Sequence, residues 1–366
     1  MFVALRDLRF AKGRFALMGA VVLLITLLVT MLSGLTAGLA RENVSAVENL
    51  PADHIVFDSG DKPAFSDSRI TVQTWREWRQ VDGVTAERLG VSMGRLAYGD
   101  DHGDDHGDDR SDDRSAAVAL FGVQPGGALA PEPAAAGKVV LSAALAADTG
   151  LTTGATVRIA GREFTVAATG GEASYSHAPV AWISIDDWEP MGRQSGADTV
   201  ATVLALRTGG TPDLAAAGAR SGTMVVPLSQ APAAIGSFSS ENGSLQLMRG
   251  LLFAISALVI GAFFTVWTIQ RRGDVAVLKA LGASTGYLLR DALAGAVIVL
   301  LAGSGIGGAL GAGLGALARD TVPFVLSPAT TVVPVTVMIL LGAGGAALAV
   351  RKITSVDPLT ALGAAR

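Results

Sequence analysis

Four long apolar runs constrain the fold more than any other feature of the chain. They cover Phe15 to Ala40, Leu251 to Ile269, Ala292 to Leu317 and Val332 to Val350. Each can cross a hydrocarbon core about 30 Å thick, which takes roughly 20 apolar residues in a helix. The first run is too long for the apolar part of a secretory signal and ends without a small-residue cleavage site. We therefore expect four transmembrane helices, with the first one retained.

The composition agrees with a membrane protein. Half of the 366 residues are apolar and only 16% are charged, which is too apolar for a soluble chain of this length. The net charge of −4 does not indicate nucleic-acid binding. The lack of cysteine excludes disulfides, thiolate nucleophiles and Cys-ligated metals, and four histidines leave little material for a His-rich site. We expect no intrinsic cofactor, no resident metal and no catalytic residues.

Basic residues near the ends of the runs predict the orientation. Clusters precede the first run, lie between the second and third, and follow the fourth: Arg6, Arg9, Lys12 and Arg14; Arg271, Arg272, Lys279 and Arg290; Arg351, Lys352 and Arg366. All three fall on one side, which the positive-inside rule makes cytoplasmic. We expect a multi-pass protein of the cell membrane with both termini in the cytoplasm.

The predicted fold class is an α-helical membrane protein with four transmembrane helices and a large mixed α+β extracytoplasmic domain between helices 1 and 2. The predicted segments are the cytoplasmic N-terminus with helix 1 (1–43), the extracytoplasmic domain (44–245), helix 2 (246–270), a cytoplasmic loop (271–290), helix 3 (291–318), an outer loop (319–331), helix 4 (332–350) and a cytoplasmic tail (351–366).

Short β-branched runs predict strands in the extracytoplasmic domain. They occur in HIVFDSG, RITVQTWREW, PVAWISIDDWEP and ATVLALRT. Another stretch predicts a strand over Val139 to Leu141, a helix over Ala143 to Thr149 and a hairpin turning at Gly161. Residues Gly99 to Ser115 repeat Asp-Asp followed by His or Arg, and such dense charge predicts a disordered acidic loop. Weak binding of a divalent cation by His102 and His106 is the alternative.

Glycines recur every fourth residue in the third run. These are Gly303, Gly307, Gly311 and Gly315. On a helix they share one face and let another backbone approach closely, so we expect them to serve helix packing. A ligand site on that face is the alternative. Gly34 and Gly38 form a looser face of the same kind in the first run.

A short amphipathic segment, RRGDVAVLKALGAS, follows the second run. Asp274 can cap a helix here and Gly282 can end it in the left-handed conformation. Its apolar face comprises Val275, Leu278 and Leu281, with Lys279 turned away. Such a helix is predicted to dock onto a partner protein or the membrane surface. The alternative is an interfacial helix that only anchors the neighbouring spans.

This segment resembles the cytoplasmic loop of FtsX/MacB-type (type VII) ABC transporter permeases. VVLSAALAADTGLTTGATVRIAGREFTVAA and the ending DPLTALGAAR are also similar to that family, so the resemblance covers nearly the whole chain except the acidic repeat. SYSHAPVAWISIDDW and ALRDLRFAKGRF look closest to haem-exporter (HrtB-like) or DevC-like permeases. The resemblance implies a coupling helix received by an ATPase, with coupling residues Asp274, Val275, Leu278, Lys279, Leu281 and Gly282.

The resemblance also implies partners. The chain contains no G-x-x-x-x-G-K-[ST] phosphate-binding loop, so ATP must be bound by a separate subunit. We expect two ABC ATPase subunits, a permease homodimer and membrane lipid as partners, and no nucleic acid. The isologous contact of a homodimer suits the glycine-lined faces.

Two helical faces near the outer membrane surface predict a substrate site. Met31, Gly34, Gly38 and Glu42 share one face, and if the second helix starts early, Glu241 and Met248 share another beside Arg249. Thioether and carboxylate groups can ligate haem iron, and Arg can pair with a propionate. The predicted substrate-binding residues are Met31, Gly38, Glu42, Glu241, Met248 and Arg249. In the alternative, the methionines are packing residues, Glu241 is in a loop and Arg249 reaches the headgroups.

These features predict the permease subunit of an ATP-driven ABC efflux transporter. It would extrude an amphiphile, with haem as the most specific cargo, by mechanotransmission from a separate ATPase. The alternatives are an FtsX-like signalling scaffold that regulates an extracytoplasmic hydrolase and an exporter of lipid, glycolipid or lipoprotein.

Overall fold

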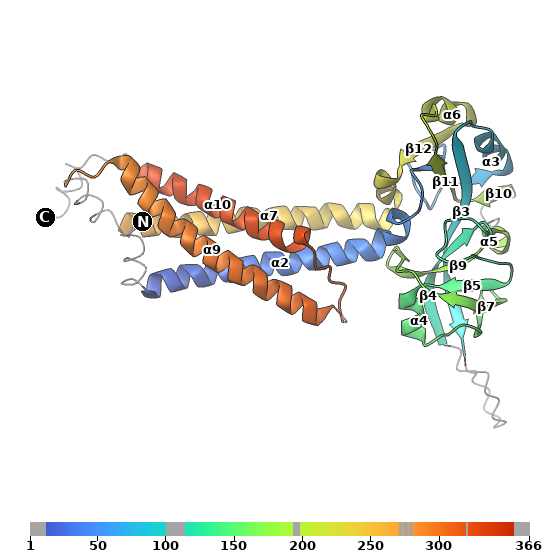
Figure 1. Ribbon diagram of the computed structural model, residues 1–366, viewed down its shortest axis with the longest axis horizontal. Coiled ribbons are helices and arrows are strands. Elements are labelled where there is room, and N and C mark those ends of the chain that lie inside the picture. Colours follow the sequence, from blue (N-terminus) through green and yellow to red (C-terminus); the bar gives the residue numbers. More distant parts are fainter. Residues whose placement is uncertain are drawn as a thin grey trace, which may run out of the picture. The chain divides into compact units, whose positions relative to one another are not determined.

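The computed structural model describes residues 12–99, 114–192, 198–270, 273, 277, 281–319 and 321–354. The chain divides into a membrane unit, Met1–Leu39 with Ser244–Arg366, and an outer unit, Ala40–Gly243. Figure 1 labels the elements of both units.

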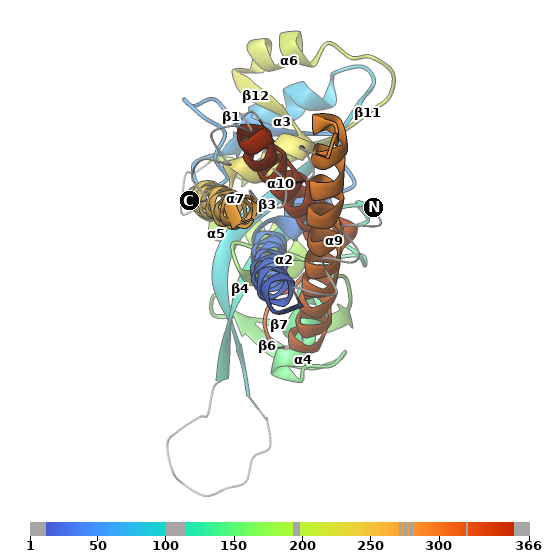
Figure 2. The same ribbon diagram turned by 90° about the vertical axis from the view of Figure 1, so that its left-hand side faces the viewer.

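The membrane unit is built from α2 (Lys12–Glu48), α7 (Gly236–Gln270), α9 (Thr285–Ala318) and α10 (Pro328–Thr354). Within the described residues, these four helices are the ones long and apolar enough to span a membrane, and Figure 2 shows α2 and α7 nearly end-on. The predicted fold class is thus confirmed: four transmembrane helices, with a mixed α+β domain inserted between the first two. Both α2 and α7 extend past the borders predicted at residues 43 and 246.

The glycine face of α9 packs against α2 of the same chain. A Cβ atom at Gly303 would lie 3.0 Å from the Gly19 carbonyl oxygen, and one at Gly307 would overlap the Leu23 carbonyl. Gly311 faces Thr30 in the same way, and Gly315 faces the ring of Phe324. We expected these glycines to suit a contact between two protomers. The structure instead places them at contacts within one chain, because the lack of a Cβ atom on these glycines lets α2 and Phe324 come close.

Gly34 and Gly38 do not leave open space on α2. A Cβ atom at Gly34 would overlap the Phe324 ring, and one at Gly38 would overlap the carbonyl group of Pro323. The Val325 N–H also donates to the Gly34 carbonyl oxygen at 3.1 Å. The expectation that these glycines make room for cargo is therefore corrected: the segment before α10 fills that space.

The packing of α9 predicts a difference between two Gly-to-Ala changes. Gly307→Ala should lower the apparent melting temperature of the purified full chain, because overpacking costs about 1–3 kcal/mol. Gly313→Ala is the matched control, since nothing lies within 4 Å of its Cβ position. It should leave the melting temperature unchanged or raise it, because Ala favours a helix over Gly by about 1 kcal/mol. Equal melting temperatures for the two variants would contradict this packing.

The outer unit is built on a mixed sheet with short helices. The strands are β1 (His54–Asp58), β2 (Ile70–Thr71), β3 (Val84–Tyr98), β4 (Arg114–Val123), β5 (Lys138–Leu141), β6 (Thr156–Ile159), β7 (Arg162–Thr169), β8 (Ser174–Tyr175), β9 (Ala178–Ser184), β10 (Thr199–Ala201), β11 (Val203–Thr208) and β12 (Thr223–Pro227). The helices are α3 (Val72–Arg79), α4 (Ala143–Thr149), α5 (Ile185–Gly192), α6 (Leu214–Ser221) and the 3-10 helix η2 (Leu228–Ala234).

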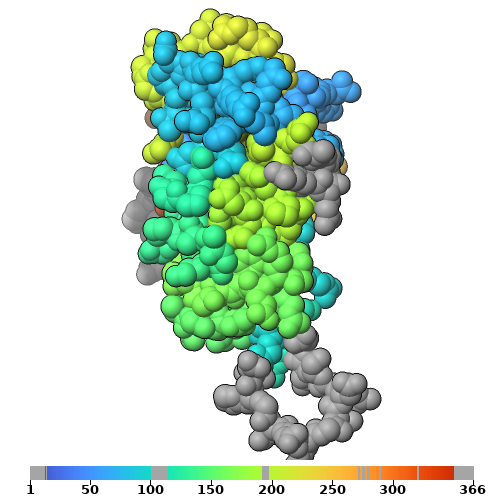
Figure 3. Space-filling model, turned by 90° about the vertical axis from the view of Figure 1, so that its right-hand side faces the viewer, coloured from blue at the N-terminus to red at the C-terminus, as the bar shows by residue number. Residues whose placement is uncertain are grey.

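The strand order runs β12-β1-β11-β3-β4-β9-β5-β7-β6, and β6 pairs back with β3 through Leu96 and Ile159. Strands β3, β4, β9, β5, β7 and β6 therefore form a closed ring, and β11, β1 and β12 extend from it as an arm. Two of the pairings, β4–β9 and β5–β7, are parallel. In Figure 3 the ring (largely green) adjoins the lobe that carries α3 and α6 (blue and yellow). Each lobe has its own core, one around Phe164 and Trp188 and the other around Trp78 and Leu206.

Three local predictions for the outer unit need correction. RITVQTWREW forms only the short strand β2 before α3, because Thr71 caps the helix and accepts a hydrogen bond from the Thr74 N–H at 3.2 Å. The aromatic end of PVAWISIDDWEP lies on α5 rather than on a strand. Arg114 and Ser115, expected in the acidic loop, belong to β4 and pair with β3. The rest of that repeat, residues 100–113, lies outside the described residues.

Candidate functional site

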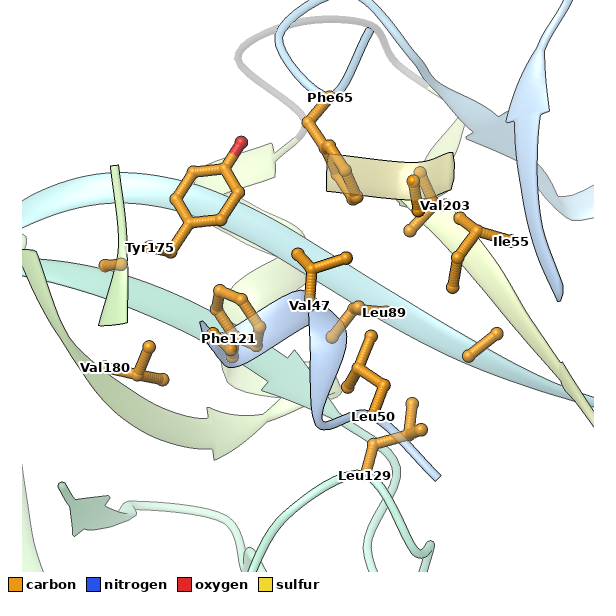
Figure 4. Close-up of a cluster of buried hydrophobic side chains, with 14 of the residues drawn as sticks. Val47, Leu50, Ile55, Phe65, Leu89, Phe121, Leu129, Tyr175, Val180 and Val203 are labelled. Atoms are coloured by element: carbon orange, nitrogen blue, oxygen red, sulfur yellow. The ribbon is translucent and has the colours of Figure 1, made fainter. Parts of the chain in front are cut away.

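The C-terminal turns of α2 and the turn that follows them form part of the main core of the outer unit. Val44 and Val47 of α2 and Leu50 just after it are at most 6% exposed. Figure 4 shows Val47 and Leu50 among side chains of the surrounding strands, including Leu89, Phe121 and others. Burial of this apolar face holds the end of α2 firmly in the outer unit.

A tight turn between β8 and β9 lies against this part of α2. Its two central residues, Ser176 and His177, have positive φ angles of 51° and 62°, a conformation that non-glycine residues seldom adopt. The preceding Tyr175 is buried in edge-to-face contacts with other aromatic rings, and burial raises the pKa of its hydroxyl. The N–H groups of Ser176 and His177 donate to the carbonyl oxygens of Asn43 and Glu42, at 3.0 and 3.3 Å. The turn is thus fixed to the side of α2.

This turn places an imidazole ring between two carboxylates. His177 Nε2 lies 2.9 Å from Glu241 Oε2, and His177 Nδ1 lies 3.9 Å from Glu42 Oε2. Because a carboxylate only accepts hydrogen bonds, Nε2 carries a proton and donates it to Glu241. The amide nitrogen of Asn43, 3.4 Å from the same carboxylate oxygen, is a second donor to it. The ring and both carboxylates are partly exposed, so a ligand from outside can reach them.

A chain of hydrogen bonds extends this group to the start of α7. The hydroxyl oxygens of Ser176 and Ser237 are 2.9 Å apart, and Ser237 donates to Asn43 Oδ1 at 2.8 Å. We call Glu42, Asn43, Ser176, His177, Ser237 and Glu241 the His177 cluster. It joins α2, the β8–β9 turn and α7. Within the described part of the chain, no group of three or more His, Asp or Glu side chains is arranged to hold a metal ion.

The structure brings together two of the predicted substrate-binding residues. Glu42 and Glu241 meet at His177, and Glu241 lies on α7 because that helix begins early, at Gly236. The other four lie in the membrane unit: Met31 is half-buried, Gly38 is packed, Met248 is 50% exposed and the Arg249 guanidinium lies 5.9 Å from the Phe253 ring centroid.

Sequence reasoning missed Asn43, Ser176, Ser237 and the role of His177. His177 was visible only as a rare histidine in a segment that resembles haem exporters. Its position beside the two glutamates depends on the left-handed turn, and Ser-His is not a typical sequence for such a turn.

Most of the predicted coupling residues fall outside the described residues, namely Asp274, Val275, Leu278 and Lys279. Leu281 and Gly282 are described. The Leu281 N–H donates to the Val277 carbonyl at 3.0 Å, as in a helical turn, and the Leu281 side chain is 79% exposed. Gly282 has a φ angle of +92°, as expected of a residue that ends a helix. The sites predicted for docking and capping remain predictions.

Family comparisons match most of the chain. Residues 15–221 match the MacB-like periplasmic core domain, and residues 247–358 match the FtsX-like permease C-terminal family. The chain belongs to the FtsX/MacB-type family of ABC transporter permeases. Such a permease is the membrane component of a transporter, not itself a catalytic enzyme, and implies a partner ATPase.

Individual proteins that match the chain share only a low sequence identity with it. A protein of Staphylococcus haemolyticus that carries the name of a proposed hemin transport system permease, HrtB, is 25% identical over 99% of both chains. A protein of the same name from Staphylococcus epidermidis is 22% identical over 99% of both chains. An uncharacterized ABC transporter permease of Mycobacterium tuberculosis is 31% identical over 33% of this chain and 34% of its own length.

Removal of the Asn43 side chain should destabilise the His177 cluster. Asn43 is 1% exposed; its Oδ1 accepts a hydrogen bond from Ser237 Oγ at 2.8 Å, and its amide nitrogen donates to Glu241 Oε2 at 3.4 Å. Asn43→Ala should therefore lower the stability of the full chain by about 1–3 kcal/mol, the cost of unpaired buried polar groups. Asn49→Ala, at an exposed position on the same stretch, is the control and should change stability little. Thermal unfolding of both purified variants measures the difference, and equal stability would contradict a central role for Asn43.

Proposed function

We propose that the chain is the permease of an ATP-driven efflux transporter for an amphiphile, most specifically haem. The observation that carries the proposal is the clustering of Glu42, His177 and Glu241, two carboxylates and an imidazole on one partly exposed surface. The similarity over full length to permeases named for hemin transport supports the same cargo. Imidazole is a common axial ligand of haem iron.

The side chains that would bind haem differ in their proposed roles. His177 would offer a nitrogen to the iron once the ring leaves Glu241. Met31 and Met248 are further ligand candidates, and Arg249 would pair with a propionate. Gly38 is no longer proposed as open space, since Pro323 lies against it.

Energy would reach the cargo from the other side of the membrane. We place both termini and the loop over residues 271–290 in the cytoplasm, where two ATPase subunits would bind the apolar face of the loop. ATP-driven closure would then move α2 and α7 and release cargo outward. Two permeases would pair through apolar faces that the chain leaves exposed on α2 and α7, which include Leu24, Leu28, Leu251, Ile255 and Leu258.

The cargo is tested with variants of the His177 cluster. Cells that express the permease with its ATPase should lose hemin tolerance when His177→Ala or Glu241→Gln is introduced, because a ligand or its partner is removed. The purified variants should show a weaker Soret band with added hemin. Glu163→Gln, at an exposed position on β7, is the matched control and should behave as the wild type.

The outcomes separate the alternatives. Wild-type tolerance and hemin binding in both cluster variants would place the site elsewhere. A wild-type chain that binds no hemin and protects no cell from it would overturn haem as cargo. Co-purification of an extracytoplasmic hydrolase would then favour a signalling scaffold, and co-purified lipid would favour a lipid exporter.

The coupling loop predicts a second, independent effect. Leu278→Asp combined with Leu281→Asp would put charge on the proposed docking face and should abolish export while the protein stays in the membrane. Ala276→Asp is the control, because a spacing of 3.6 residues per turn places it on the opposite side of the helix. Export and ATPase binding are measured in the same membranes. Unchanged export in the double variant would rule out coupling through this face.

A further inference from the structure

The two helices that reach the outer unit are held there by different kinds of contact. The end of α2 buries Val44 and Val47 in the main core, and the turn after it buries Leu50 there. The segment that leads into α7 is buried in the same core through Ala231, Ala234 and Ile235, whereas in the first turns of α7 itself Phe238 is partly buried and residues 239–243 are exposed or partly exposed. The outer unit therefore holds the end of α2 and the segment before α7 by apolar packing, whereas the first turns of α7 have little of it.

Polar contacts supply the rest of the attachment of α7. Ser237 contacts Ser176 and Asn43 at 2.9 and 2.8 Å, and Glu241 accepts a hydrogen bond from His177 at 2.9 Å. The side chains of Ser176, His177, Ser237 and Glu241 are partly exposed, so water can replace their hydrogen bonds at small net cost, whereas apolar contacts cannot be replaced in this way. The contact that can open and close is thus the one between the β8–β9 turn and α7.

We propose that Ser176, Ser237 and Asn43 form a latch that releases the first turns of α7 from the β8–β9 turn in each transport cycle. The end of α2 stays fixed in the outer unit throughout. The inference rests on the proposed function, since it needs ATP-driven movement of the spans. Ser176 is then a positioning residue for transport, which acts through α7 and not on the cargo.

The natural absence of cysteine allows a direct test. Ser176→Cys with Ser237→Cys replaces two hydroxyl groups 2.9 Å apart by thiols that can form a disulfide across the latch. The matched control is Ser45→Cys with Ser174→Cys, since Ser45 Oγ lies 2.9 Å from the backbone nitrogen of Ser174, which puts position 45 of α2 beside position 174 of β8. Both pairs are made in the full-length permease bound to its ATPase. Crosslinking is measured without nucleotide and in an ATP-trapped state, without any cargo.

The latch predicts opposite behaviour for the two pairs. The Ser176/Ser237 pair should crosslink readily without nucleotide and much less in the ATP-trapped state, and its disulfide should abolish export until a reductant is added. The Ser45/Ser174 pair should crosslink equally in both states and leave export intact. Equal crosslinking of the latch pair in both states, or export with its disulfide closed, would overturn the proposal. So would loss of export caused by the control disulfide.

A single substitution covers the case in which a paired variant is not produced. Ser237→Cys alone should react faster with a maleimide in the ATP-trapped state, and Ser45→Cys alone should not. An unchanged rate at position 237 would overturn the latch. Hemin tolerance of the His177→Ala variant tests the cargo separately, so the wrong cargo would leave the nucleotide-dependent crosslinking intact.

Discussion

The continuity of α2 is the constraint on which both units depend. A bilayer offers no hydrogen-bond partners to the backbone, so the chain must cross it as a helix. Because α2 runs unbroken from Lys12 to Glu48, one helix contributes both to the packing of the membrane unit and to the core of the outer unit. Val44 and Val47 are three residues apart and share a face there. Each fully buried aliphatic side chain contributes about 1.5–3 kcal/mol, so this attachment is strong.

Packing against α2 also explains why α9 has glycines on one face. The hydroxyl of Thr26 on α2 donates to Ser304 on α9 at 3.2 Å, and the glycines of α9 allow the approach. The sequence pattern predicted close packing correctly in kind, since small residues at four-residue spacing form one face. It did not identify the partner, because a face that suits a second protomer suits a neighbouring helix of the same chain equally well.

Local sequence patterns predicted the individual helices and strands better than they predicted which distant strands pair. The four spans and the strand–helix–hairpin stretch that includes α4 follow from apolar length, alternation and turn residues within a few positions. The closure of the ring through Leu96 and Ile159 joins residues far apart in the chain, and no local pattern encodes it. RITVQTWREW was misassigned because β-branched residues at its start outweighed the capping role of Thr71. Helical spacing indicated Glu42 and Glu241 as candidate residues. The position of His177 beside them depends on the left-handed β8–β9 turn, which the local sequence does not indicate.

The strain in that turn is itself informative. A non-glycine residue in the left-handed region costs of order 1–3 kcal/mol, and Ser176 and His177 both adopt it. Glycines would relieve the strain and keep both backbone hydrogen bonds to α2. They would remove the hydroxyl that contacts Ser237 and the imidazole that contacts Glu241. The Ser176–Ser237 hydrogen bond adds about 0.5–1.5 kcal/mol and the one from His177 to the charged Glu241 about 1.5–3 kcal/mol, which is of the same size as the strain. The contacts of these two side chains with α7 thus offset a strained turn, so loss of those contacts would leave the strain uncompensated.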